Sequence, residues 1–223
     1  MKTIRGKWLP LVAFLNLSLQ SPVPVEKEPQ HQVKFENQYV RVLDVTFPPG
    51  YTTLFHTHSN DNVAIVIKGG KRRTERVGEQ PNDGISQTGN ANFAKASYTH
   101  RITNTGETTL RFIDVEILAS SGLPEMPRSL DKVNGQQLIL ENERVRIYRI
   151  KIEPGQATKL FTYDLPSLTV VVSPSKVQIE TPKQKTRTES LKPGDFRWHA
   201  GAFSHLLRNL GSTSFEAIDI ELK

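Results

Sequence analysis

The chain has 223 residues, no cysteine, and 29 basic against 23 acidic side chains, a formal net charge of +6 at pH 7. The lack of cysteine excludes disulfides, thiolate catalysis and a cysteine-linked lipid anchor. The densest basic run, residues 71–76, is expected to be a solvated strand and turn, because nucleic-acid binding needs a wider basic surface with interleaved aromatics. We therefore expect no nucleic-acid partner.

The N-terminus has the layout of an export signal. Lys2, Arg5 and Lys7 precede an apolar run from Trp8 to Leu19, about a dozen residues and too few to cross a bilayer as a helix. Residues 1–21 are thus expected to be a signal peptide, which leaves a mature chain of about +3 with no membrane span. A periplasmic or secreted location follows, with a short membrane tether as the alternative.

Residues 22–34 contain prolines and several charges and are expected to form an extended linker. His31 lies in this segment and is given no role. From here on the chain is written twice at a constant offset of 105 residues: residues 36–50 and 141–155 share six identities in fifteen positions, where about one is expected by chance. The repeat predicts two domains, residues 35–119 and 137–223, joined by a linker at 120–136.

Both copies predict many short strands. Alternating or β-branched stretches are separated by turns rich in Gly, Pro and Asn, and no long segment has helical periodicity. The predicted strands are residues 39–47, 63–67, 72–77 and 111–118 in the first copy, and 144–152, 168–172, 176–179 and 215–222 in the second. The expected fold class is all-β, with two tandem β-barrels or double-sheet jelly rolls, because such closure removes exposed sheet edges.

The first copy holds a histidine cluster. Side chains alternate along a strand, so His56 and His58 point to one face about 6.5–7 Å apart, and Asn62 shares their phase. His100 must come from another strand. Three neutral imidazoles suit Fe, Mn, Zn, Ni or Cu and leave positions open for water or substrate. A strand bulge would make Asp61 the oxygen ligand instead of Asn62.

The second copy lacks this cluster. Phe161 and Tyr163 replace the first two histidines, and their rings are expected to fill the space of a metal, leaving His205 as a packed residue. Two carboxylates recur in each copy, including the copy without the cluster, which indicates a structural role in pairing the barrels or in satisfying groups at strand ends. They are Asp114, Glu116, Asp219 and Glu221.

These spacings resemble the two motifs of the cupin superfamily, G-x5-H-x-H-x3,4-E-x6-G and G-x5-P-x-G-x2-H-x3-N. The matching residues are Gly50, His56, His58 and Gly69 in the first motif, and Gly89, His100 and Asn104 in the second. The resemblance implies a two-domain cupin with a degenerate second barrel, the double-stranded β-helix fold, and a divalent metal on three histidines and a glutamate. The chain departs from the pattern at Asn62, Lys95 and Ser97, so only a three-histidine site is expected.

Cupins range from oxygenases and isomerases to storage and sugar-binding proteins, so three functions stay open. In an enzyme, the histidines would hold the ion, Asn62 would orient water or substrate, and Lys68 or Arg101 would meet a substrate carboxylate. The alternatives are a non-catalytic small-ligand or metal-binding module, and a structural protein with a relic site. Barrel pairing within the chain favours a monomer over a homodimer by family analogy alone.

Overall fold

The regular elements of the computed structural model, which describes residues 21–123, 135–182 and 184–223, are strands apart from one short 3-10 helix. The expected signal peptide therefore lies outside the described residues. The elements of the first half are β1 (Val23–Pro24), η1 (Val25–Lys27), β2 (His31–Glu36), β3 (Val40–Phe47), β4 (His56–His58), β5 (Asp61–Lys68), β6 (Gly70–Arg76), β7 (Asn82–Ser86), β8 (Ala91–Ala94), β9 (Tyr98–Asn104) and β10 (Leu110–Ile117).

The second half repeats this order from β2 onward. Its strands are β11 (Gln136–Glu141), β12 (Val145–Ile152), β13 (Phe161–Tyr163), β14 (Ser167–Val171), β15 (Ser175–Glu180), β16 (Arg187–Leu191), β17 (Phe196–His199), β18 (Phe203–Asn209) and β19 (Phe215–Leu222). The all-β prediction is confirmed. Over the described ranges, no helix is long and apolar enough to cross a membrane.

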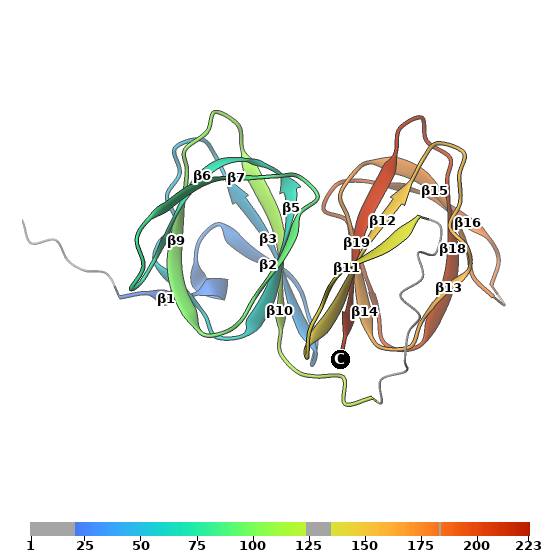
Figure 1. Cartoon of the computed structure of the whole chain (residues 1–223), viewed down its shortest axis with the longest axis horizontal. Coiled ribbons are helices and arrows are strands. Elements are labelled where there is room, and N and C mark those ends of the chain that lie inside the picture. The colour runs from blue at the N-terminus through green and yellow to red at the C-terminus, as the bar shows by residue number, and fades with distance from the viewer. Residues whose placement is uncertain (1–20, 124–134, 183) are drawn as a thin grey trace, which may run out of the picture.

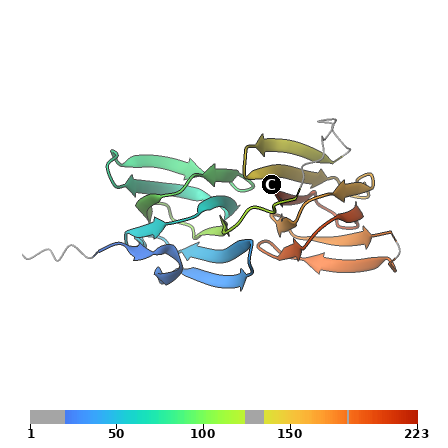
Figure 2. The same cartoon turned by 90° about the horizontal axis from the view of Figure 1, so that it is seen from below.

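Each half is a barrel of two opposed sheets, and the two barrels lie side by side (Figures 1 and 2). In the first barrel the strand orders are β1-β4-β9-β6-β7 and β2-β3-β10-β5-β8; in the second they are β13-β18-β15-β16 and β11-β12-β19-β14-β17. All pairs are antiparallel except β1 with β4. The expected jelly-roll architecture is therefore present twice.

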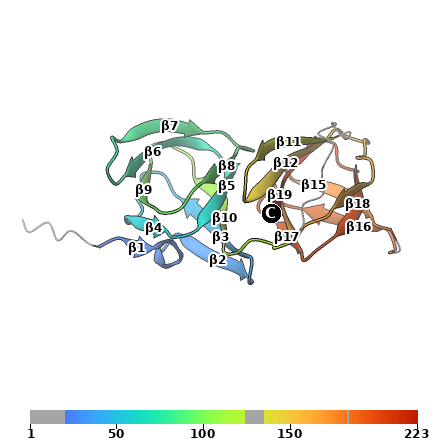
Figure 3. The same ribbon diagram turned by 60° about the horizontal axis from the view of Figure 1, so that its bottom comes forward.

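The segment expected as a linker is part of the first barrel. β1 pairs with β4, with Val23 opposite His56 (Figure 3). Val25 is 1% exposed, and His31 opens β2, which pairs with β3. The folded unit thus begins at Val23 rather than near Phe35. Prolines misled the prediction because an edge strand tolerates a residue that cannot donate a backbone hydrogen bond.

The barrels pack through the outer faces of their five-stranded sheets. Sixteen buried aliphatic side chains form one continuous cluster across this interface, eight from each barrel. Every member from the first barrel has its partner 105 positions later, so the interface is built twice from the same strand positions. The pairs are Val40/Val145, Val42/Ile147, Val63/Leu168, Ile65/Val170, Ile67/Val172, Ile113/Ile218, Val115/Ile220 and Ile117/Leu222.

A reciprocal polar contact borders this cluster. Arg111 of the first barrel pairs with Asp44 and donates to the Pro193 carbonyl of the second at 2.9 Å. Arg149 of the second barrel donates to the Gly89 carbonyl of the first at 3.0 Å. Gly194 has a φ of +88°, and a Cβ there would lie 2.5 Å from Arg111 Nη2. Glycine is therefore required at this turn by conformation and by the neighbouring barrel.

Truncating the interface should destabilise the whole chain. Ile113 is 1% exposed, so Ile113→Ala should lower the free energy of unfolding by about 2–5 kcal/mol, because the close-packed sheets cannot collapse fully into the cavity. The matched control Ile85→Ala, at a residue 67% exposed, should change it by about 0.5 kcal/mol or less. Urea unfolding followed by circular dichroism measures both. Equal effects of the two substitutions would contradict this account of the interface.

Candidate metal centre

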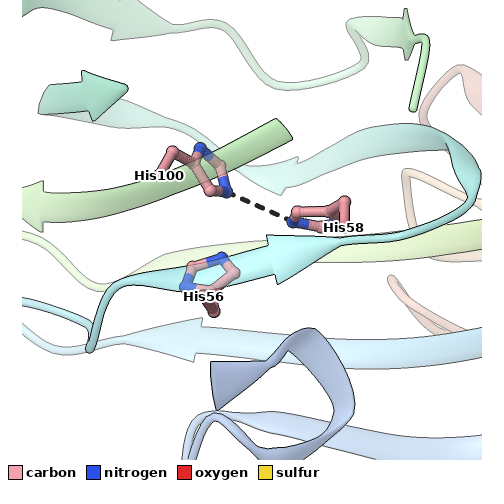
Figure 4. A group of neighbouring side chains, drawn as sticks. All are labelled: His56, His58 and His100. Atoms are coloured by element: carbon pink, nitrogen blue, oxygen red, sulfur yellow. Dashed lines mark hydrogen bonds between the residues drawn. The ribbon is translucent and has the colours of Figure 1, made fainter. Parts of the chain in front are cut away.

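Two neighbouring strands bring the three predicted histidines to one point inside the first barrel (Figure 4). β4 carries His56 and His58, and β9 places His100 directly opposite His56. One ring nitrogen from each lies within 4.8 Å of the others, and Nε2 of His58 is 3.2 Å from Nε2 of His100. The side chains of His56 and His58 are almost fully buried.

The ring nitrogens of these histidines fit a cation. Nδ1 of His56 lies 2.9 Å from the Leu54 carbonyl, which can only accept, so this nitrogen carries the proton and Nε2 keeps a lone pair. That Nε2 is buried and has no hydrogen-bond partner among the described residues. A buried lone pair without a donor is costly, and a divalent ion held by the three imidazoles would satisfy it.

Burial keeps the three imidazoles neutral. It lowers the pKa of His56 to about 4, of His58 to about 3 and of His100 to about 2, with further lowering from the neighbouring histidines. Lone pairs are therefore available at neutral pH, as metal binding requires. The donor set supports the expected cofactor, a divalent metal ion. Fe, Mn, Zn, Ni and Cu all accept imidazole ligands.

Asn62 lies beside the cluster and is held by two hydrogen bonds. Its oxygen accepts from the Tyr98 hydroxyl at 2.9 Å, and its amide donates to Asp114 at 2.6 Å. Burial raises the pKa of Tyr98, so the hydroxyl keeps its proton and remains the donor. Asp114 Oδ2 is in turn 3.6 Å from Nδ1 of His58. The Tyr98-Asn62-Asp114 chain therefore lies behind one metal ligand, and this Nδ1 has no hydrogen-bond partner among the described residues.

Asp61, the alternative oxygen ligand, is engaged elsewhere. Its carboxylate accepts from the Ala96 backbone N–H at 2.8 Å and pairs with Arg144 at 3.1 Å. The strand keeps the regular phase that puts Asn62, rather than Asp61, on the inner face. The ligand set drawn from the described residues is thus three histidines.

A fourth histidine supports the site and was missed by sequence reasoning. The ring of His31 lies 4.6 Å from that of His56, and its Nδ1 is 2.6 Å from the buried carboxylate of Glu28. Tyr51 also donates to Glu28, at 3.1 Å. The repeat carried a signal for this placement, because His31 and Gln136 occupy equivalent strand starts, but that signal was hidden by the prolines before β2.

A cavity of about 500 Å³ extends from His58, His100 and Asn62. Its cationic side chains are Arg72 and Arg76 from β6, and the Arg76 guanidinium lies 4.4 Å above the Tyr98 ring. The run 71–76 is therefore not simply a solvated strand: alternate residues face the cavity, with Arg76 opposite His100 in the strand register.

Lys68 and Arg101, the expected contacts for a substrate carboxylate, do not line this cavity. Lys68 is exposed at the end of β5. Arg101 forms a bidentate pair with Glu75, at 2.6 and 2.8 Å, and lies over the Phe55 ring. Arg101 follows His100 directly, so strand alternation turns it to the other face of β9.

The second barrel keeps the carboxylate equivalent to Asp114 but lacks the histidine ligands. Tyr163 stands where His58 stands in the first copy, and its hydroxyl donates to Asp219, the equivalent of Asp114. Gln136 donates to the same hydroxyl oxygen at 3.0 Å. The recurring carboxylates therefore face the barrel interiors, and the expectation that they pair the barrels is wrong. Glu221 accepts from the backbone N–H groups of Asp164 and Leu165 just after β13, as the alternative role at strand ends predicted.

No family model and no curated relative matches the chain. Solved structures match its fold. AerE from Microcystis aeruginosa aligns with a TM-score of 0.67 at 16% identity, over 91% of this chain and 98% of that one. Salicylate 1,2-dioxygenase from Pseudoaminobacter salicylatoxidans aligns at 0.58 and 11% identity, over 82% and 68% of the two chains.

Oxalate decarboxylase from Bacillus subtilis also aligns, with a TM-score of 0.57 at 14% identity, over 82% of this chain and 68% of the other. A further structure of that decarboxylase is described with Mn(II) centres. These are cupin-fold proteins. The fold of this chain is thus that of a two-barrel cupin, as the motif spacing predicted.

Metal analysis tests the centre directly. Purified protein should hold about one divalent ion per chain, because the three imidazoles form a single site. The double variant His56→Ala/His58→Ala should lose the ion, whereas His205→Ala, at the equivalent of His100 in the second barrel, should retain it. Mass spectrometry of the metal content checks all three proteins. Retention of the ion by the double variant would contradict the assignment.

The metal content measured at lower pH tests whether the three histidines are buried. Protons compete with the metal only when the imidazoles can be protonated, and burial lowers their pKa values to about 4 or below. The ion should therefore remain bound at pH 5.5, where an ordinary histidine of pKa about 6.5 is mostly protonated. Release near pH 6.5 would show that the histidines are solvated rather than buried.

Proposed function

We propose that the first barrel binds a small organic anion beside a divalent metal ion and acts on it as an oxygenase or an isomerase. One observation carries this proposal: three neutral imidazoles meet beside a cavity of about 500 Å³, which His58 and His100 line together with two arginines. A metal site and a place for an anionic substrate are thus adjoining. When bound, the ion would supply Lewis acidity or redox chemistry.

The chain's own residues would position the substrate and keep the site rigid. Arg72 and Arg76 carry planar guanidinium groups suited to bidentate binding of a carboxylate. Arg72 is held by Ser86 at 3.0 Å, and Arg76 pairs with Glu79 at 3.4 Å. Salicylate and oxalate, the substrates named for two structural neighbours, are carboxylic acids, which supports this substrate class.

The charge of the site supports the non-catalytic alternative as well. Asn62 is neutral and is committed to Tyr98 and Asp114, so the site has no carboxylate ligand and a bound ion keeps its full positive charge. Such a site also suits storage of a metal or capture of an anion without turnover. A structural protein with a relic site is the third possibility, and it would remain alone only if the first barrel bound neither a metal ion nor a small anion.

We also propose that the protein is exported to the periplasm or secreted, and that it works as a monomer whose barrels pair within the chain. The basic and then apolar order of residues 1–19 supports export. The mass of the mature protein tests export, because removal of residues 1–21 leaves a chain that begins just before β1.

The internal barrel interface supports the monomer. Light scattering tests this by measuring the mass of the protein in solution.

Turnover assays separate enzyme from binder. The iron- or manganese-loaded protein should convert at least one member of a panel of hydroxy acids, keto acids, diols and thiols, followed by oxygen uptake and by product analysis for isomers. His56→Ala/His58→Ala should abolish turnover. Arg72→Gln/Arg76→Gln should raise KM about tenfold or more for acidic substrates, because a charge-assisted hydrogen bond is worth about 1.5–3 kcal/mol.

Arg101→Gln is the matched control, since its guanidinium is bonded to Glu75 away from the cavity. It should leave KM unchanged. If Arg101→Gln raised KM as much as Arg72→Gln/Arg76→Gln does, the substrate carboxylate would instead contact the other face of β9. No conversion of any panel member by the loaded protein would favour the binding module.

A further inference from the structure

The second barrel is not filled by its aromatic residues. Phe161 and Tyr163 do pack beside His205, with the Tyr163 and His205 rings 5.6 Å apart. A cavity of about 790 Å³ nevertheless remains, lined by residues of β14 to β19 and by Lys34, Asp44 and Arg111 of the first barrel. This volume lies within the range of about 300–1,000 Å³ typical of small-molecule sites.

Much of the cavity wall is apolar and rigid. Its aliphatic and aromatic side chains come from six strands, and four of these side chains belong to the buried core of this barrel. The lining residues of this kind are Val171, Ile179, Leu207 and Phe215 from the core, with Leu191, Phe196 and Phe203 beside them. Such a wall favours a hydrocarbon or aromatic body.

One side of the cavity is cationic. Arg187 and Arg197 each bond to the same carboxylate, Glu189, at 2.7 Å. Two positive charges thus share one negative charge, and each guanidinium spends only one of its five N–H donors on it. His199 and His205 also line the cavity, and burial lowers their pKa values to about 4 and about 3, so they add no charge at neutral pH.

This arrangement is not a remnant of the first barrel's site. Arg187 and Arg197 correspond to Asn82 and Asn92 in the first copy, whose two cavity arginines lie on β6 instead. Over the described residues, three metal-ligating side chains come together only in the first barrel. The two cavities therefore carry their positive charge on different strands. Among the described residues, the second cavity has no group of three metal-ligating side chains.

We propose that the second barrel binds a small carboxylic acid with an apolar body, without a metal. The guanidinium groups of Arg187 and Arg197 receive the carboxylate, and the aliphatic and aromatic wall contacts the rest of the molecule. Glu189 holds the two arginines in place and competes with the ligand for them. This site is separate from the metal centre and from the function proposed for the first barrel.

Binding of phenylacetate, 3-phenylpropionate and 4-methylpentanoate to the full chain tests the proposal, by titration calorimetry and ligand-observed NMR. At least one acid should bind with a submillimolar dissociation constant, and its neutral amide should bind about tenfold more weakly or worse. Arg187→Gln/Arg197→Gln should weaken acid binding by about the same factor. Failure of all three acids to bind, or equal binding of acid and amide, would overturn it.

Glu189→Gln gives a result of opposite sign and guards against a misfolded arginine variant. Without the competing carboxylate, both arginines are free for the ligand, so the acid should bind several-fold more tightly. If Arg187, Glu189 and Arg197 only stabilise one another, Glu189→Gln weakens acid binding or leaves it unchanged, and the proposal is wrong.

Variants of the first barrel separate this site from the metal centre. His56→Ala/His58→Ala and Arg72→Gln/Arg76→Gln should leave acid affinity unchanged here, whatever they do to turnover. Loss of acid binding in either variant would place the acid in the first barrel and refute the second site.

Discussion

The packing of two five-stranded sheets, face to face, is the constraint on which the rest of the molecule depends. Each sheet is buried on its outer side by the other barrel and on its inner side by its own barrel core. The outer side is aliphatic in both copies at the same eight positions, so the chain joins its halves as a symmetric dimer would join two subunits. Stability is thereby concentrated in one shared layer, and the barrel interiors are left to differ.

The interiors show how far that difference goes. Asp114 and Asp219 occupy equivalent places, yet one accepts from Asn62 beside the metal position and the other accepts from a tyrosine hydroxyl. A buried carboxylate needs a donor in either case, because an unpaired one is costly. The second barrel thus has the Tyr163 phenol in place of the His58 imidazole, and Asp219 keeps a hydrogen-bond donor. It also retains a cavity, whose positive charge comes from Arg187 and Arg197.

Strands, barrels and the three histidines were accessible from sequence because each depends on local alternation, repetition or spacing. What escaped depends on contacts between distant segments. His31 is buried because it packs against the ring of His56 from β4, and the prolines before β2 disguised that strand. The basic run at 71–76 was recognised as a place that could attract anions, but the run does not show that only alternate residues, among them Arg72 and Arg76, face inward. The second cavity was missed because the rings of Phe161 and Tyr163 occupy less of the barrel than their size suggested.

The middle of β10 has a consequence for pairing specificity. Ile113, Val115 and Ile117 face the other barrel, while Asp114 and Glu116 face inward, and β10 pairs with both β3 and β5. A slip of one residue would drive two carboxylates into the dry layer between the barrels and turn three aliphatic groups toward the polar interior. Misregistered pairings of this strand are therefore heavily disfavoured, and the carboxylates that serve the site also keep the central strand in its correct alignment.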